Sequence, residues 1–137
     1  MNTQTAPRSP LQIAILLLAA ATAVIHLITG MQVTDLLFIL NGLGYLGLAG
    51  ALYLPVAFLS PYRGLVRWGL IAYTALTIIL WAIINGHLDP VGLVTKAIEV
   101  LLIVALFVEM RRGQASPLRK TDKSHAKSPR SGYPLGA

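Results

Sequence analysis

The chain has 137 residues, of which 55% are hydrophobic and only 12% are charged, and this balance is typical of a membrane protein. It contains no cysteine, which excludes disulfides, thiolate metal sites, iron–sulfur clusters and haem attached through cysteine. The net charge is +6, but the cations gather near the chain ends and in one connecting segment. Membrane topology explains this distribution better than nucleic-acid binding does, so we expect no nucleic-acid partner.

The first apolar run covers residues 11–29, after a short polar segment, 1–10, that we expect to be disordered. About 20 residues at roughly 1.5 Å each cross a bilayer core of about 30 Å, so this run predicts a transmembrane helix. A cleaved signal peptide is the alternative, because Ala21, Thr22 and Ala23 imitate a cleavage site. The apolar run continues past that site, which favours the helix.

The second predicted helix covers 36–59, with Thr34 or Asp35 as its N-cap and Pro55 as a kink near its end. It carries a band of small residues, which would let a neighbouring helix approach closely where lipid gives no hydrophobic drive for association. The candidate packing residues are Gly42, Gly44, Gly47, Gly50 and Ala51. The third predicted helix covers 65–85, and its Trp68 and Trp81 suit opposite membrane interfaces, because they are about 20 Å apart along a helix.

The fourth predicted helix, 90–110, begins with Asp89 and Pro90 as an N-cap and first-turn pair. Its apolar run is interrupted by Lys96 and Glu99, which are three residues apart and can therefore pair on one helix face. An unpaired charge at the bilayer centre costs about 3 kcal/mol, so such residues usually face protein or water. The pair is either purely structural, with Lys96 able to reach the membrane surface, or part of a functional polar site.

Short connections between the helices make neighbours antiparallel, so we expect an all-α fold: an up-down-up-down four-helix transmembrane bundle over 11–112. Arg8, Arg63 and Arg67 then lie on the same side as the basic C-terminal tail. The positive-inside rule places both termini in the cytoplasm, in the cytoplasmic (inner) membrane. The tail, 113–137, should be disordered and serves either as a topological anchor or as a binder of anionic lipid.

Six polar residues fall at comparable depth in the outer half of this bundle and make a candidate polar site if they face inward. They are His26, Asn41, Tyr45, Thr77, Lys96 and Glu99. Polar sites in other four-helix proteins are built in this way, although such residues also act as simple contacts between helices worth about 0.6 kcal/mol each. No catalytic triad or phosphate-binding loop is visible, so we expect no enzymatic activity.

Two histidines, His26 and His87, fall toward the outer side and are candidate axial ligands of a b-type haem. His87 follows Gly86 in a loop, and the chain offers no second histidine pair for transmembrane electron transfer. We therefore expect no cofactor, with haem as an alternative. Histidines and carboxylates are too few, and too irregularly spaced, for a zinc or di-metal site.

In the segments LLFILNGLGY (36–45) and KAIEVLLI (96–103), the chain resembles small four-span prokaryotic membrane proteins of uncharacterised type. The resemblance would cover residues 11–112 and implies the same four-helix architecture. It brings no known activity, cofactor or catalytic residue.

The expected role is that of a non-enzymatic accessory or packing subunit of a membrane complex, for example a respiratory or photosynthetic one. Its partners would be the lipid bilayer and either other membrane subunits or further copies of the chain. A small transporter or oligomeric channel that uses the polar site is the first alternative. A haem-binding redox subunit is the second.

Overall fold

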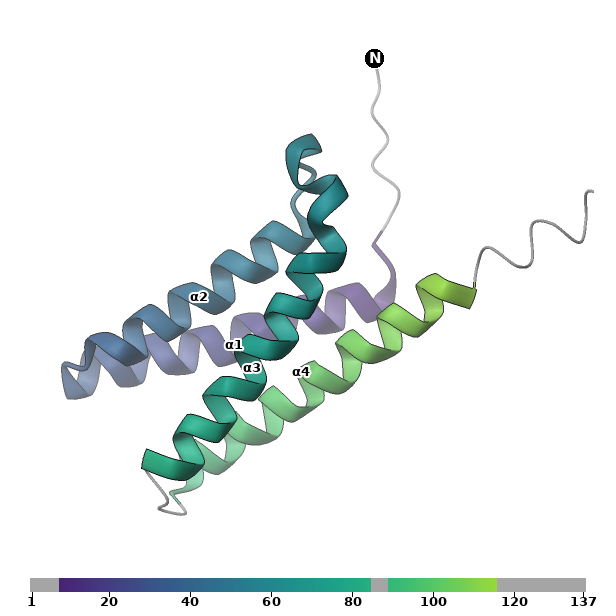
Figure 1. Cartoon of the computed structure of the whole chain (residues 1–137). Helices are drawn as coiled ribbons and strands as arrows, with labels where there is room; N and C mark the ends of the chain where they lie inside the picture. Colours follow the sequence, from purple (N-terminus) through teal and green to yellow (C-terminus); the bar gives the residue numbers. More distant parts are fainter. Residues whose placement is uncertain (1–7, 85–88, 116–137) are drawn as a thin grey trace, which may run out of the picture.

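The computed structural model describes residues 8–84 and 89–115, and this part of the chain is all-helical without a strand (Figure 1). Its elements are α1 (Pro10–Val33), α2 (Leu36–Tyr53), the short 3₁₀ helix η1 (Ala57–Tyr62), α3 (Arg63–Ile84) and α4 (Pro90–Ala115). The end segments expected to be disordered lie outside the described residues over 1–7 and 116–137. Residues 113–115 belong to α4.

The start of α1 is fixed by a reciprocal pair of side-chain hydrogen bonds. Ser9 Oγ accepts from the Gln12 backbone N–H (3.3 Å), and Gln12 Oε1 accepts from the Ser9 N–H (3.2 Å). This capping box satisfies two backbone donors that a helix start otherwise leaves without partners. Pro10 follows in the first turn, where its fixed φ suits a helix and its missing N–H is not needed.

The chain turns back between α1 and α2 through two residues. Thr34 adopts a left-handed conformation (φ 54°), and the Asp35 N–H then donates to the Gly30 carbonyl (2.9 Å). Asp35 also caps α2, because its Oδ1 accepts from the Leu37 N–H (2.8 Å). A Cβ atom on Gly30 would lie 2.8 Å from atoms of Ile39, so the two helices meet closely at this end.

The helix expected over 36–59 is divided in the structure. α2 ends at Tyr53, and Leu54 is extended (φ −66°, ψ 139°). Pro55 explains this break, because proline disfavours a helical conformation of the preceding residue and has no N–H to continue the helix. Helical structure resumes in η1 and continues directly into α3.

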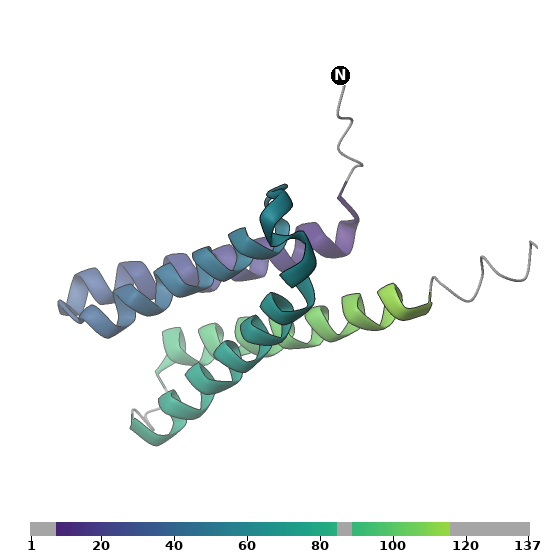
Figure 2. The ribbon, with the colours of Figure 1, turned by 45° about the horizontal axis from the view of Figure 1, so that its top comes forward.

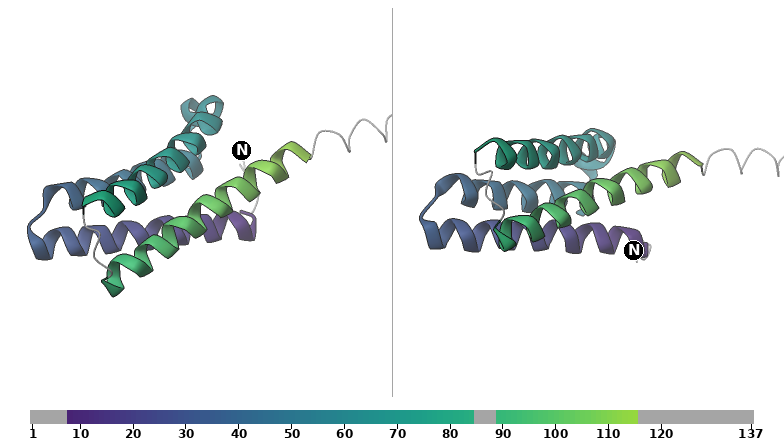
Figure 3. Two further views of the ribbon diagram at one scale, coloured as in Figure 1. Left: turned by 60° about the horizontal axis from the view of Figure 1, so that its bottom comes forward. Right: turned by 90° about the horizontal axis from the view of Figure 1, so that it is seen from below.

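Among the four long helices, α1 lies beside α2, α4 packs against α1, and α3 contacts both α2 and α4 (Figure 2). α1 and α2 pack along most of their lengths, whereas α4 runs obliquely across α1 (Figure 3). The core between the helices contains Ile15, Ala19, Ala23, Tyr45, Ala49, Leu52, Leu70, Ile71, Leu102 and Leu106. These residues pack the middle and one end of the bundle.

The outside of the helices is also apolar. Leu37, Ile83 and Leu101 are 75%, 75% and 56% exposed, and many other large apolar side chains on all four helices are similarly exposed. In the described residues, four helical segments are long and apolar enough to cross a membrane, and each of them contains most or all of one long helix. An apolar exterior on helices of this length indicates a membrane protein.

Candidate functional site

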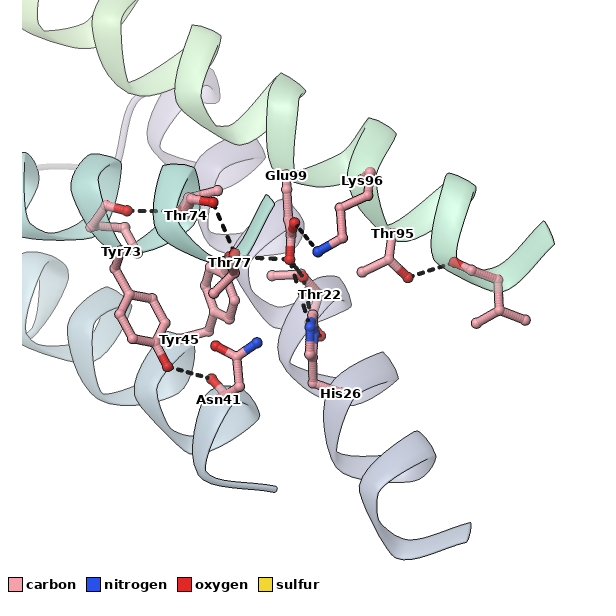
Figure 4. Close-up of polar contacts among 12 residues, drawn as sticks. Thr22, His26, Asn41, Tyr45, Tyr73, Thr74, Thr77, Thr95, Lys96 and Glu99 are labelled. Atoms are coloured by element: carbon pink, nitrogen blue, oxygen red, sulfur yellow. Dashed lines mark hydrogen bonds and ion pairs between the residues drawn. The ribbon is translucent and has the colours of Figure 1, made fainter. Parts of the chain in front are cut away.

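Glu99 lies at the centre of a polar cluster between the helices (Figure 4). Its side chain on α4 is fully buried, and the ammonium nitrogen of Lys96, one turn earlier, is 2.6 Å from Glu99 Oε2. Burying a lone carboxylate costs several kcal/mol, and the Lys96 charge offsets part of that cost. The structure therefore contains the ion pair that the three-residue spacing allows.

α1 contributes Thr22 and His26, which are one turn apart and both buried. The Thr22 hydroxyl donates to Glu99 Oε1 (3.3 Å), and His26 Nε2 lies 3.7 Å from the same oxygen. His26 Nδ1 is 2.8 Å from the Thr22 carbonyl oxygen, which can only accept a hydrogen bond. Nδ1 therefore carries a hydrogen, and Nε2 is the nitrogen that can gain or lose a proton facing Glu99.

α2 and α3 contribute Tyr45 and Thr77. The Tyr45 hydroxyl is 3.2 Å from Glu99 Oε1 and 2.8 Å from Thr77 Oγ1, and Thr77 Oγ1 is in turn 2.8 Å from the Thr74 carbonyl oxygen. The Thr74 carbonyl oxygen can only accept, so the single Thr77 hydroxyl hydrogen is donated there. The Tyr45 hydroxyl is then the donor toward its two neighbours, Glu99 Oε1 and Thr77 Oγ1, and the charged carboxylate forms the stronger bond. Tyr45 thus links Glu99 on α4 with Thr77 on α3.

Asn41, another residue of the predicted polar site, makes no bond to Glu99. Its Oδ1 is buried and has no hydrogen-bond partner among the described residues, whereas its backbone carbonyl accepts from the Tyr73 hydroxyl (3.2 Å). A buried polar atom without a partner costs about 1–3 kcal/mol. This orphaned amide is therefore the polar group most in need of a further partner.

A cavity of about 450 Å³ lies beside the cluster, within the size range of small-molecule sites. Its polar lining includes His26, Asn41, Thr77 and Lys96, and its apolar lining includes Phe38, Leu80 and Trp81. His26 and Lys96 both line the cavity and both face Glu99. They therefore link the cavity with the buried carboxylate.

Among the described side chains that contact Glu99, Thr22 is the one that was not predicted from the sequence to belong to a site. Its hydroxyl donates a hydrogen bond to the Glu99 carboxylate and so connects α1 with α4. Its backbone carbonyl oxygen accepts from His26 Nδ1 and so orients the imidazole ring. The available signal was its position four residues before His26, which places both on one face of a helix.

The small residues of α2 fall on different faces. A Cβ atom on Gly42 would lie 2.7 Å from Leu27 Cγ of α1, and one on Gly44 would collide with the Tyr73 hydroxyl of α3. These two glycines therefore permit close helix contacts inside the chain.

Gly47 and Gly50 do not bring another helix this close. Gly47 has no atom within 4 Å of an added Cβ, and Gly50 has only Leu54 of its own segment, at 3.6 Å. Ala51 is half-buried. Gly47 thus leaves open surface on α2.

Of the two candidate haem ligands, His26 lies in the described part of the chain. Its Nδ1 faces the Thr22 carbonyl oxygen and its Nε2 faces Glu99. His87 lies outside the described residues. Over 8–84 and 89–115 no group of three or more potential metal-ligating side chains occurs.

A second polar group, partly buried, lies further along α4. Glu109 Oε2 accepts from the Tyr53 hydroxyl (3.0 Å) and from Arg67 Nε (3.2 Å), and so joins α2, α3 and α4. Arg8 donates to the Tyr53 carbonyl oxygen (3.4 Å) and adds the start of α1 to this end of the bundle. From the sequence these arginines predict only topology, and the structure adds their contacts with Tyr53 and Glu109.

Together these features show that the protein, in residues 8–84 and 89–115, is all-helical, with four helices of membrane length and a buried, charged polar cluster between them. Residues 1–108 match the model of a family of unknown function (DUF7475), and the chain belongs to this family. The expected resemblance to an uncharacterised family is confirmed at that level. Neither curated proteins nor solved structures gave a match.

Proposed function

We propose that the protein is a small, proton-coupled membrane transporter whose proton site is Glu99 with His26. The observation that carries the proposal is the cluster itself: a fully buried carboxylate, a histidine whose Nε2 faces it, and a Tyr45 hydroxyl that can donate either to Glu99 or to Thr77. Ionisable residues inside membrane spans commonly belong to ion or proton pathways. No enzymatic activity is part of the proposal.

The proposed topology is an up-down-up-down crossing of the inner membrane with both termini in the cytoplasm. Arg8, Arg67 and Glu109 are linked at one end of the bundle, directly or through Tyr53, so the arginines gather at that end. Arg111 and Arg112 extend from α4 near the same end. Such clustering of arginine supports a cytoplasmic location for it.

The apolar core favours a transporter over an open channel. Leu102 and Leu106 follow Glu99 along α4 and are fully buried, and they pack with Leu70 in the core. A conducting pore needs a continuous polar lining, which these residues interrupt. In a transporter the layer formed by Leu70, Leu102 and Leu106 would open and close during transport. The solute would reach Glu99 from the cavity.

The test is a flux measurement on the full chain reconstituted into liposomes that contain a pH-sensitive dye. The low-molecular-weight fraction of a cell extract supplies solutes on one side, under an imposed membrane potential. We expect a change of internal pH with the wild type and its loss with Glu99→Gln. Glu109→Gln is the matched control on the same helix and should keep the flux. A wild type that moves no protons, or an unchanged Glu99→Gln flux, would contradict the proposal.

An accessory-subunit role is the second candidate function, and it was the first choice from sequence alone. The observation that favours it is the open surface at Gly47, where a partner helix could approach closely. In that case Gly47→Leu should abolish co-purification of a stoichiometric membrane partner from the native host. A wild type that purifies without such a partner would remove this candidate.

A further inference from the structure

The walls of the 450 Å³ cavity are suited to a largely apolar molecule. Aromatic and aliphatic side chains, among them Phe38, Leu80 and Trp81, form much of its surface. Sites for small organic molecules combine such walls with a few polar groups that fix orientation. The few polar groups here should therefore identify the chemistry of the occupant.

The charges around the cavity favour a neutral occupant. Lys96 is balanced by Glu99 at 2.6 Å, so little positive charge is left to hold an anion. Asp89 is the other charged residue of the lining, and its Oδ1 accepts from the Gly92 N–H (2.6 Å) at the start of α4. The positive end of the helix dipole balances part of that negative charge.

Lys96 and Asn41, two polar residues of the cavity lining, have hydrogen-bond donors available for a bound molecule. The Lys96 ammonium has three hydrogens, of which Glu99 accepts one in the described part of the chain. The Asn41 amide adds two N–H donors, and no partner among the described residues holds its Oδ1 in place. The Asn41 side chain is drawn beside the cluster in Figure 4. Lys96 and Asn41 both line the cavity, so a molecule beside them meets N–H donors of two side chains.

We propose that this cavity binds a neutral, largely apolar molecule through a carbonyl oxygen that accepts hydrogen bonds from Lys96 and Asn41. The inference rests on the proposed function in taking this cavity as the solute site. An aromatic ketone, a quinone and an apolar amide share the required chemistry. A hydrocarbon of the same shape lacks it.

The two tryptophans of the chain provide a reporter and its control. Trp81 lines the cavity, whereas Trp68 lies about 20 Å away along α3, with its ring against Phe107. Trp68→Phe leaves Trp81 as the only tryptophan, and Trp81→Phe leaves Trp68. Quenching of Trp68 fluorescence in the Trp81→Phe variant measures the contribution of probe molecules that are dissolved in the detergent around the helices.

The experiment titrates each purified variant in mild detergent with para-bromoacetophenone and, separately, with para-bromoethylbenzene. Both molecules carry a bromine that quenches nearby tryptophan, and they differ by a carbonyl in place of a methylene group. Relative to Trp68, we expect Trp81 to be quenched at a three- to tenfold lower concentration of the ketone than of the hydrocarbon. Asn41→Leu, in the Trp68→Phe background, should reduce this preference.

The proposal would be overturned if the ratio of the quenching concentrations of the ketone and the hydrocarbon were the same at Trp81 as at Trp68. A ketone preference that survives intact in Asn41→Leu would overturn the assignment of the carbonyl to Asn41. The measurement is made at equilibrium without a proton gradient, so it can fail while Glu99-dependent flux is present. Conversely, if the protein binds the ketone but shows no proton flux, the binding site is supported and the proposed transport function is contradicted.

Discussion

Lys96 and Glu99 form an ion pair within a single turn of α4, with 2.6 Å between the ammonium nitrogen and a carboxylate that is fully buried. The pair explains how a segment of membrane length can carry two charges. Each charge alone would be costly there, but together with Thr22 and Tyr45 they satisfy one another. The same arrangement makes the two residues interdependent.

Replacing Lys96 alone should therefore be more harmful than replacing both members of the pair. Lys96→Met leaves a buried carboxylate without its cation, and we expect the free energy of unfolding to fall by about 3–5 kcal/mol. The double variant Lys96→Met with Glu99→Gln should lose much less. Unfolding in mixed micelles, followed by circular dichroism, measures both. A double variant as unstable as the sum of the single variants would show that the two side chains do not interact.

The glycines of α2 should differ sharply in their tolerance of a methyl group. Gly42→Ala would place Cβ 2.8 Å from the Ala23 carbonyl oxygen, which is backbone and cannot move aside, so we expect a loss of about 1–3 kcal/mol. Gly47→Ala meets open space and should change stability by less than about 0.5 kcal/mol. The same unfolding assay compares the two. Similar losses for both variants would contradict the close packing of α1 against Gly42.

Much of the helical structure could be predicted from the sequence, because apolar runs, caps and prolines act locally. The all-helical class and four membrane-length segments follow from such signals. The end of α2 was harder to predict, because Pro55 can either kink a helix or end it, and neighbouring packing decides between the two.

The site could be predicted only in part, since spacing along one helix says nothing of which face meets another helix. Lys96 and Glu99 pair through their own helix, so their contact was visible in the sequence. The hydroxyl of Thr22 reaches Glu99 only because α4 crosses α1 at that point, which no local pattern encodes. Asn41 was grouped with the cluster by depth, yet its amide oxygen has no partner among the described residues.

Thr22 should prove as important to the cluster as the residues that the sequence suggested. Thr22→Val keeps the shape of the side chain but removes the hydroxyl that donates to Glu99, so we expect a loss of about 1.5–3 kcal/mol of unfolding free energy. Thr22→Ser keeps the hydroxyl and should lose clearly less. Circular dichroism in mixed micelles gives both values. Equal stability of Thr22→Val and the wild type would mean that this hydrogen bond does not support the buried carboxylate.

The proposed topology can be tested directly because the chain has no cysteine, so that each introduced cysteine is the only thiol. Val33 at the end of α1 and Ser60 in η1 are both exposed, and the proposed up-down order places them on opposite sides of the membrane. In intact cells, a membrane-impermeant maleimide should label Val33→Cys. It should label Ser60→Cys only after the membrane is permeabilised, because the arginines near η1 favour the cytoplasmic side. The reverse pattern would invert the orientation and turn the cavity toward the cytoplasm. Labelling of both positions from one side would contradict the alternating order itself.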